Sequence, residues 1–261
     1  MKNDILVKII KYGIYATVFT PLIIWGELIS PFNFGKVIIF RSLVEVMAVF
    51  YFVLALKDRS YLPRKDNIFW AFLFFALVFT LTTATSISPY SSFWGSLERM
   101  GGLFTFWHYF LFYIILVSVF KTGTEWRRFL DLTIIVGLAS ALYGFGQKTG
   151  FDIFIGADRD RIFGTIGNSS SFAGYQLLVA FLALTLFSQS RTSIIRRVFL
   201  GVIFLISLIV LLMAATRGAM LGAAGGLFIF VFLWFLNKRS VWARRVVIIF
   251  LALVILTLAS V

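Results

Sequence analysis

Three arginines in this sequence lie in short polar, glycine-containing segments that precede long apolar runs. Arg161 begins RIFGTIGN (161–168), Arg217 lies in TRGA (216–219), and Arg99 lies in WGSLERMGG (94–102). A guanidinium stays charged, and its planar fork donates paired hydrogen bonds to the oxygens of one phosphate group. These residue types therefore predict a site that binds a phosphate-type anion.

The same segments hold residues that suit the beginning of a helix. The candidate N-caps are Asn168, Ser169 and Thr216. A ligand can approach the backbone closely at Gly164, Gly167 and Gly218. The first turn of a helix presents unpaired N–H groups and a partial positive charge, which together attract anions. We therefore expect several helix ends to converge on one substrate through these binding residues: Arg161, Arg217, Arg99, Asn168 and Gly218.

Other ionisable residues receive a structural interpretation. Asp158 and Asp160 have the D-x-D spacing of some metal sites, but the adjacent arginines favour a solvated loop, and the chain has no cysteine. His108, the only histidine, lies within an apolar run and is interpreted as a packed interior residue. Arg41 and Glu45 are four residues apart on one helical face, so we expect them to pair with each other. We predict no metal and no cofactor.

The elements that must position these residues follow from an apolar composition. Of 261 residues, 61% are hydrophobic and only 13% are charged, whereas roughly 25% of the residues in a globular domain are charged. A water-soluble protein of this size cannot bury so much apolar surface, but lipid can cover it. The formal net charge is +13, yet the basic residues lie between apolar runs instead of in one patch, so we expect no nucleic-acid partner.

The sequence predicts an all-α fold, a polytopic bundle of about nine transmembrane helices that forms a single domain, residues 1–261. A helix needs about 20 apolar residues to cross the hydrocarbon core. Nine stretches approach that length, at about 9–26, 37–56, 67–86, 103–120, 129–147, 169–188, 198–216, 218–236 and 246–261. The seventh and eighth form one run of about 39 residues, broken only at 216–218, so the chain must turn there.

The charges of the loops predict an orientation. When the N-terminus is placed in the cytoplasm, 17 of the 24 Lys and Arg residues fall on the cytoplasmic side. The remaining seven are Lys36, Arg41, Arg99, Lys148, Arg159, Arg161 and Arg217. Because basic residues are concentrated on the cytoplasmic side of membrane proteins, we predict a cytoplasmic N-terminus. The anion site then lies on the external, or periplasmic, face of the cytoplasmic (inner) membrane.

Four segments together resemble the O-antigen ligase and O-antigen polymerase family of bacterial envelope glycosyltransferases. They are FWGSLERMGGL (93–103), YGFGQ (143–147), RIFGTIGN continuing to residue 175, and TRGA (216–219). Each segment is short, but the four occur in order and at matching places in the predicted topology. The resemblance covers the chain from about residue 30 to its end.

The resemblance implies an enzyme of about twelve helices with a large external loop, of which this chain is the N-terminal portion. Members transfer a glycan from undecaprenyl diphosphate to a hydroxyl acceptor on a glycan, a glycolipid or a protein, without a metal. Carried over by motif, Arg161 and Arg217 hold the lipid diphosphate. The family's catalytic histidine lies in the large loop, so we expect it beyond Val261 and expect the chain alone to be inactive.

Two other functions are compatible with these residues. One is a flippase for lipid-linked oligosaccharides or a similar transporter, although transporters usually place their polar groups near the membrane midplane and contain internal repeats. Here the unusual charges lie at outer helix ends, and no repeat is visible. The other is a non-catalytic membrane subunit that only holds a partner.

Overall fold

The computed structural model describes residues 2–151, 153–156, 160–189 and 193–237, and these residues contain helices and no strand. The helices are α1 (Lys2–Thr17), α2 (Phe34–Lys57), α3 (Asn67–Ala84), α4 (Pro89–Trp94), α5 (Leu103–Val119), α6 (Gly123–Gly146), α7 (Ser169–Phe187), α8 (Ile194–Met213) and α9 (Arg217–Asn237). Two short 3-10 turns, η1 (Thr20–Leu22) and η2 (Arg59–Tyr61), lie in the connections that follow α1 and α2.

Six segments of the described residues are long and apolar enough to cross a membrane: Asp4–Leu22, α2, α3, α6, α7 and α8. Leu103–Val119 in α5 and Arg217–Leu233 in α9 are apolar but shorter. The prediction of an all-α membrane protein is therefore confirmed, with six helices of membrane-crossing length among the described residues. The ninth predicted stretch, 246–261, lies outside the described residues.

The first helix begins and ends earlier than the predicted stretch 9–26. It closes at Thr17, and Pro21 falls within the short turn η1 that follows. Proline has no N–H to donate to the preceding turn, and its ring clashes with a continuing helix. The apolar residues after position 17 therefore belong to a connection, although their hydropathy matches that of the helix.

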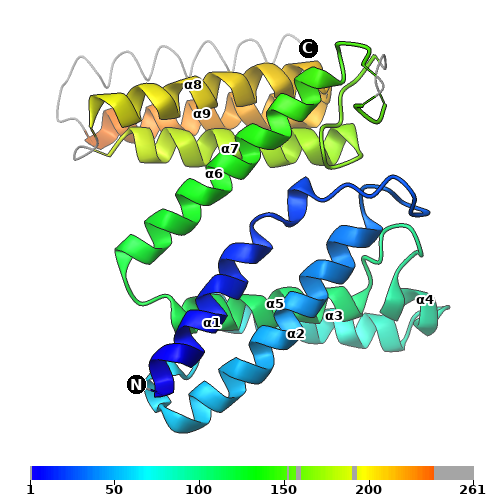
Figure 1. The fold of residues 1–261 in the computed structure, drawn as a ribbon, viewed down its shortest axis with the longest axis vertical. Coiled ribbons are helices and arrows are strands. Elements are labelled where there is room, and N and C mark those ends of the chain that lie inside the picture. Colours follow the sequence, from blue (N-terminus) through cyan, green and yellow to red (C-terminus); the bar gives the residue numbers. More distant parts are fainter. Residues whose placement is uncertain (1, 152, 157–159, 190–192, 238–261) are drawn as a thin grey trace.

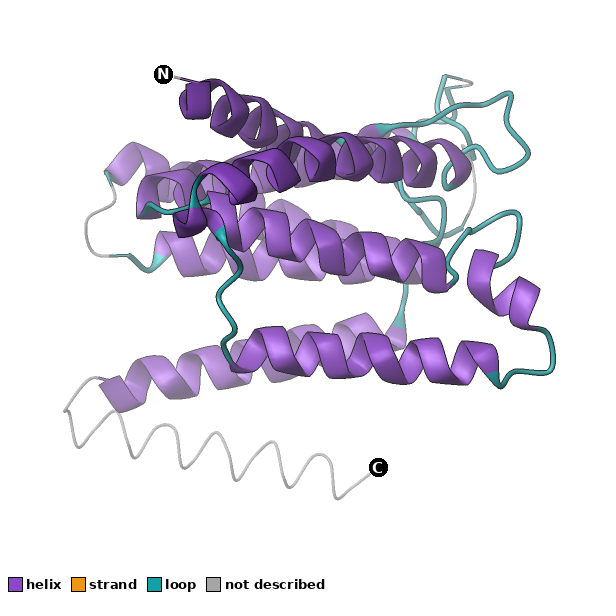
Figure 2. Ribbon diagram, turned by 90° about the horizontal axis from the view of Figure 1, so that it is seen from below, coloured by secondary structure: helices purple, strands orange, loops and turns teal. Residues whose placement is uncertain are grey.

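The helices form two groups joined by α6 (Figure 1). In the first group α1, α2, α3 and α5 pack together, and in the second α7, α8 and α9 do so. Helix α6 starts beside the first group, where it follows α5, and crosses to pack against α7 and α8. In Figure 1, α1, α2 and α6 are inclined to the other long helices, but every long helix runs between the same two sides of the molecule, so the connections fall at two ends (Figures 1 and 2).

Each group has its own buried core. In the first, Ile14 of α1, Met47 of α2 and Ile115 of α5 are almost fully buried against one another. In the second, Phe172 of α7 and Leu211 of α8 are buried together with residues of α6 and α9. The helix surfaces that face away from these two cores are also apolar. Such a surface is costly in water but is expected where lipid is the solvent.

Glycine allows the close approach of helices in both groups. A Cβ at Gly13 of α1 would lie 2.6 Å from the side chain of Met47, and a Cβ at Gly137 of α6 would lie 2.4 Å from Val179 of α7. Small residues at an interface let helix backbones approach closely, which is how helices gain van der Waals contact in lipid.

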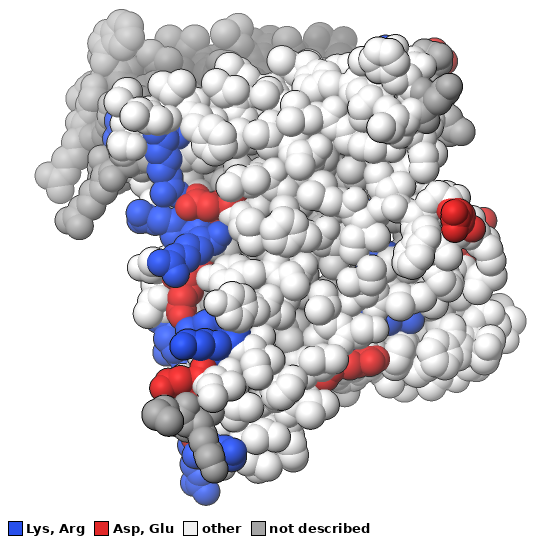
Figure 3. Space-filling model, viewed as in Figure 1, with Lys and Arg blue, Asp and Glu red and all other residues white. Residues whose placement is uncertain are grey.

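Basic side chains gather at one end of the helices (Figure 3). We call this the basic end, where α2, α5 and α7 end and α3, α6 and α8 begin. At the opposite, loop end, α1, α3 and α6 end and α2, α5 and α7 begin. The Lys and Arg residues of the loop end that the structure describes are Lys36, Arg41, Arg99, Lys148, Arg161 and Arg217. At the basic end, Arg196 pairs with Asp131 at 2.6 Å and Lys11 pairs with Glu125.

We predict that Gly137→Leu destabilises the protein, because its side chain must displace the β-branched Val179 in a packed interface. Overpacking of this kind costs about 1–3 kcal/mol. Gly174→Leu is the matched control, since nothing lies within 4 Å of a Cβ at Gly174 of α7. Thermal unfolding in detergent micelles should show a lower midpoint for Gly137→Leu only. Equal midpoints for the two variants would contradict the packing described here.

Candidate functional site

A buried glutamine holds the segment that contains Arg161. Gln147 follows α6 and is 1% exposed. Its Oε1 accepts hydrogen bonds from the backbone N–H groups of Phe163 (3.1 Å) and Gly164 (2.9 Å), and its Nε2 donates to the carbonyl of Ile155 (2.8 Å). One side chain thus satisfies three backbone groups of a connection whose described residues form neither helix nor strand. Sequence reasoning placed Gln147 in a motif but assigned it no role.

A lysine and a serine hold Thr165, the next residue of the same segment, in place. The hydroxyls of Ser140 in α6 and Thr165 are 2.7 Å apart and hydrogen-bonded. The Nζ of Lys36, in the first turn of α2, donates to the Thr165 carbonyl. Because α2 belongs to the first helix group and Thr165 lies just before α7 of the second, Lys36 joins the two groups at the loop end. Lys36 is one of the seven basic residues assigned to the outer side from the sequence, but the sequence did not predict this contact.

Two glycines give the segment its compact path. Gly164 and Gly167 have φ of 52° and 84°, in the left-handed region where side chains are strained. A Cβ at Gly164 would lie 2.3 Å from Phe172, and a Cβ at Gly167 would lie 2.3 Å from Phe32. The two aromatic rings therefore lie directly against the backbone. Asn168 then caps α7, as the sequence predicted, because its Oδ1 accepts from the N–H groups of Ser170 (3.0 Å) and Ser171 (3.1 Å).

Arg161 is attached to the turn between α8 and α9. Its Nε donates to the carbonyl of Ala214 at 3.0 Å. Ala214 caps the C-terminus of α8, and Ala215, with φ of 49°, reverses the chain so that α9 begins at Arg217. Arg217 is thus three residues from the atom that Arg161 contacts. The structure brings these two predicted site residues to one place at the loop end.

The start of α9 has polar groups without a described partner. The exposed side chain of Arg217 makes no hydrogen bond or ion pair with the described residues. Thr216 does not cap the helix as predicted: it is 8% exposed, and its Oγ1 has no hydrogen-bond partner in the described part of the chain. The tight turn at Ala215 buries this side chain instead of presenting it to the first turn. Gly218 is exposed, and nothing lies within 4 Å of where its Cβ would be.

Arg99 lies apart from the Arg161–Arg217 pair. It belongs to the connection between α4 and α5, where its backbone N–H donates to the Ser96 carbonyl at 3.2 Å. Helix α4 packs on α3 and α5, in the first helix group. The side chain of Arg99 is exposed, and no contact within the described residues joins it to Arg161 or Arg217. The structure thus places Arg161 against the turn that precedes Arg217, while the convergence of the arginines on one ligand stays a prediction.

Ionisable residues also meet between α2 and α5, but not in the predicted pairing. Arg41 is 7% exposed; its Nε donates to the Thr105 hydroxyl (3.1 Å) and its Nη2 to the Met100 carbonyl (2.9 Å). Glu45 pairs with His108 instead of with Arg41, and its Oε1 lies 3.0 Å from the histidine Nε2. The expectation of an Arg41–Glu45 pair was wrong because α5 offers each residue a closer partner.

His108 has the packed, hydrogen-bonded position that the sequence predicted. It is 7% exposed, and its Nδ1 lies 2.7 Å from the Phe104 carbonyl of the preceding turn. Its Nε2 faces Glu45 of α2, whose side chain is 58% exposed, so this contact lies at the edge of the α2–α5 interface.

No group of three or more His, Cys, Asp or Glu side chains that could hold a metal ion occurs among the described residues. Asp158, one of the two carboxylates of the D-x-D spacing, lies outside them. Asp160 is exposed, and its backbone carbonyl accepts from the Nζ of Lys148 at 2.9 Å.

Comparison of the chain with protein-family models, with curated proteins and with solved structures found no match.

We predict that Gln147→Leu loosens the segment 160–168 while the helices stay folded. The variant leaves the N–H groups of Phe163 and Gly164 buried without a partner, at a cost of about 1–3 kcal/mol each. Hydrogen–deuterium exchange of peptides that cover this segment should become faster. Gln189→Leu, at an exposed position, is the control and should leave exchange there unchanged. Unaltered exchange in Gln147→Leu would show that the glutamine does not hold the segment.

Proposed function

We propose that this protein transfers a glycan from an undecaprenyl-diphosphate-linked donor to a hydroxyl acceptor at the external face of the cytoplasmic membrane, in the manner of O-antigen ligases. The observation that carries this proposal is the contact of Arg161 with the α8–α9 turn. It brings Arg161 and Arg217 together at the loop end of an apolar helix bundle. Two arginines and a helix N-terminus at one place suit a diphosphate, which carries charge on two adjacent phosphoryl groups.

The proposed chemistry requires stabilisation of a leaving group. A hydroxyl oxygen attacks the anomeric carbon, the bond from that carbon to the diphosphate oxygen breaks, and the hydroxyl proton passes to a base. Negative charge grows on the diphosphate, where fixed guanidinium groups and helix N–H groups stabilise it best. The leaving group then needs no general acid.

The base is assigned to no residue of this chain. His108 is engaged by Glu45 and by the Phe104 carbonyl within the first helix group, away from the 161–168 segment. The family resemblance places the catalytic histidine in a large external loop, and His108 does not match that position. The role that we propose for the residues described here is to bind the donor.

The proposed topology has about nine spans in this chain, an N-terminus in the cytoplasm and the loop end outside. The concentration of Lys and Arg at the basic end supports this orientation, because such residues are enriched on the cytoplasmic side (Figure 3). It would place Arg161 and Arg217 at the external surface, where a lipid-linked glycan donor presents its diphosphate.

A second candidate, a flippase for lipid-linked oligosaccharides, is favoured by the Glu45–His108 pair. Glu45 is the twelfth residue of the 24-residue helix α2, and ionisable pairs inside membrane helices often serve transport. A vesicle assay with a labelled undecaprenyl-diphosphate glycan separates the two candidates. A transferase forms a new glycosidic bond to an acceptor, whereas a flippase moves the label across the bilayer without one.

We predict that Arg217→Lys weakens binding of undecaprenyl diphosphate about tenfold or more, equivalent to about 1.4 kcal/mol. Lysine keeps the charge but cannot make the paired contact of a guanidinium. Affinity can be measured with the protein in lipid nanodiscs. Arg128→Lys is the matched control, because Arg128 is exposed on α6 near the basic end. Unchanged affinity in Arg217→Lys would count against the proposed donor site.

Arg99→Lys tests the structure against the sequence prediction. Since Arg99 lies apart from Arg161 and Arg217, we expect this variant to bind undecaprenyl diphosphate as tightly as the unmodified protein. Weakening equal to that of Arg217→Lys would mean that the three arginines act on one ligand, as the sequence suggested.

A further inference from the structure

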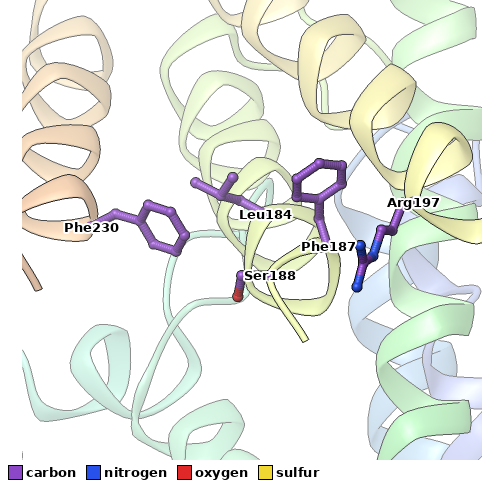
Figure 4. Close-up of a pocket in the computed structure, with 5 residues that line it drawn as sticks. All are labelled: Leu184, Phe187, Ser188, Arg197 and Phe230. Carbon is purple, nitrogen blue, oxygen red and sulfur yellow. The ribbon is translucent and has the colours of Figure 1, made fainter. Parts of the chain in front are cut away.

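A pocket of about 400 Å³ lies at the basic end, between the ends of three helices. Its lining residues are Leu184, Phe187, Ser188, Arg197 and Phe230. Figure 4 shows Phe230 of α9 on one side of the pocket and Arg197 of α8 on the other, with the α7 residues between them. The pocket has no part in the proposed donor site, because Arg161 and Arg217 lie at the opposite end of the same helices.

The charged residue of the pocket lies at the level where α7 ends. The Nη2 of Arg197 donates to the carbonyl of Gln189 at 3.5 Å, just beyond the last residue of α7. The Nη2 of Arg127, on α6, donates to the side-chain Oε1 of the same glutamine at 3.5 Å. Two guanidinium groups therefore meet around Gln189, and none of the described residues that line the pocket is a carboxylate.

The apolar wall of the pocket extends from that level toward the middle of the helices. Helices α7 and α9 run side by side in the same direction, since Gly222 lies against Leu177 and Gly226 against Phe181. The same spacing sets Phe230 level with Thr185, next to Leu184. Phe230 and Leu184 thus lie about one helical turn, or about 5 Å, farther from the helix ends than Ser188 and Arg197.

We propose that this pocket binds an anionic phospholipid. The guanidinium of Arg197 receives the phosphodiester at the level of the headgroups, and the acyl chain lies along Leu184, Phe187 and Phe230. Arginine donates to phosphate oxygens in pairs, and basic pockets between membrane helices attract anionic headgroups. The volume lies within the range of small-molecule sites. This site is independent of glycan transfer, and either function can fail without the other.

The test is the binding of phosphatidylglycerol, with phosphatidylcholine as the neutral comparison, measured by native mass spectrometry of the protein released from micelles. We expect phosphatidylglycerol to bind the unmodified protein more tightly than phosphatidylcholine. Arg197→Gln should weaken phosphatidylglycerol binding about fivefold, the effect of one basic residue near an anionic lipid, and should leave phosphatidylcholine binding unchanged.

Arg128→Gln is the matched control, because it removes one charge from an exposed position near the same end, outside the pocket lining. Equal weakening in Arg128→Gln and Arg197→Gln would overturn the proposal, since it would show a general attraction of the basic end to anionic lipid. A second variant, Leu184→Trp, keeps Arg197 and fills the apolar part of the pocket. We expect it to displace phosphatidylglycerol also, and full binding in this variant would overturn the assignment of the acyl chain.

Discussion

A backbone group that leaves a helix inside an apolar bundle has no water to bind, so the protein itself must supply its hydrogen-bond partner. The connection between α6 and α7 satisfies this requirement with side chains drawn from elements on both sides of the molecule. Gln147 binds three of its backbone groups, and Lys36 binds a fourth from the other helix group. The path of the segment, and hence the position of Arg161, follows from these contacts.

Apolar packing and polar contacts together hold the helices in both groups. Between α6, α7 and α8 the packing is largely apolar, with glycine admitting close approach, and the buried Gln176 adds a hydrogen bond to the Gly137 carbonyl at 3.0 Å. Between α2 and α5 polar contacts recur along the parallel helices: Arg41 binds Thr105, Glu45 binds His108, and the hydroxyl of Tyr51 lies 3.1 Å from that of Ser118. Lipid gives helices little hydrophobic reason to associate, so hydrogen bonds and close packing must fix their register.

The sequence predicted the helices well because a membrane-crossing helix is a property of its own residues. It predicted the cap at Asn168 for the same reason, since the atoms involved are two and three residues apart. It failed where the partner is distant in the chain. The contacts of Glu45 with His108 and of Gln147 with Phe163 depend on packing or on a loop path that periodicity does not reveal. Likewise, nothing in the residues around Arg99 separates it from Arg161; only the arrangement of α4 and α5 does.

The hydrogen bond between Arg161 and Ala214 requires a particular residue at only one of its two positions. The donor is a particular side chain, whereas the acceptor is a main-chain oxygen that any residue would supply. The side chain at position 214 is constrained only by size, because it is buried at 0% exposure. The three contacts of Gln147 are unequal in the same way. Among related sequences, the positions that contribute the side chain should stay fixed, while the positions that contribute only a main-chain atom are freer to vary. Correlated substitutions would therefore not reveal these contacts, even though they position the proposed donor site.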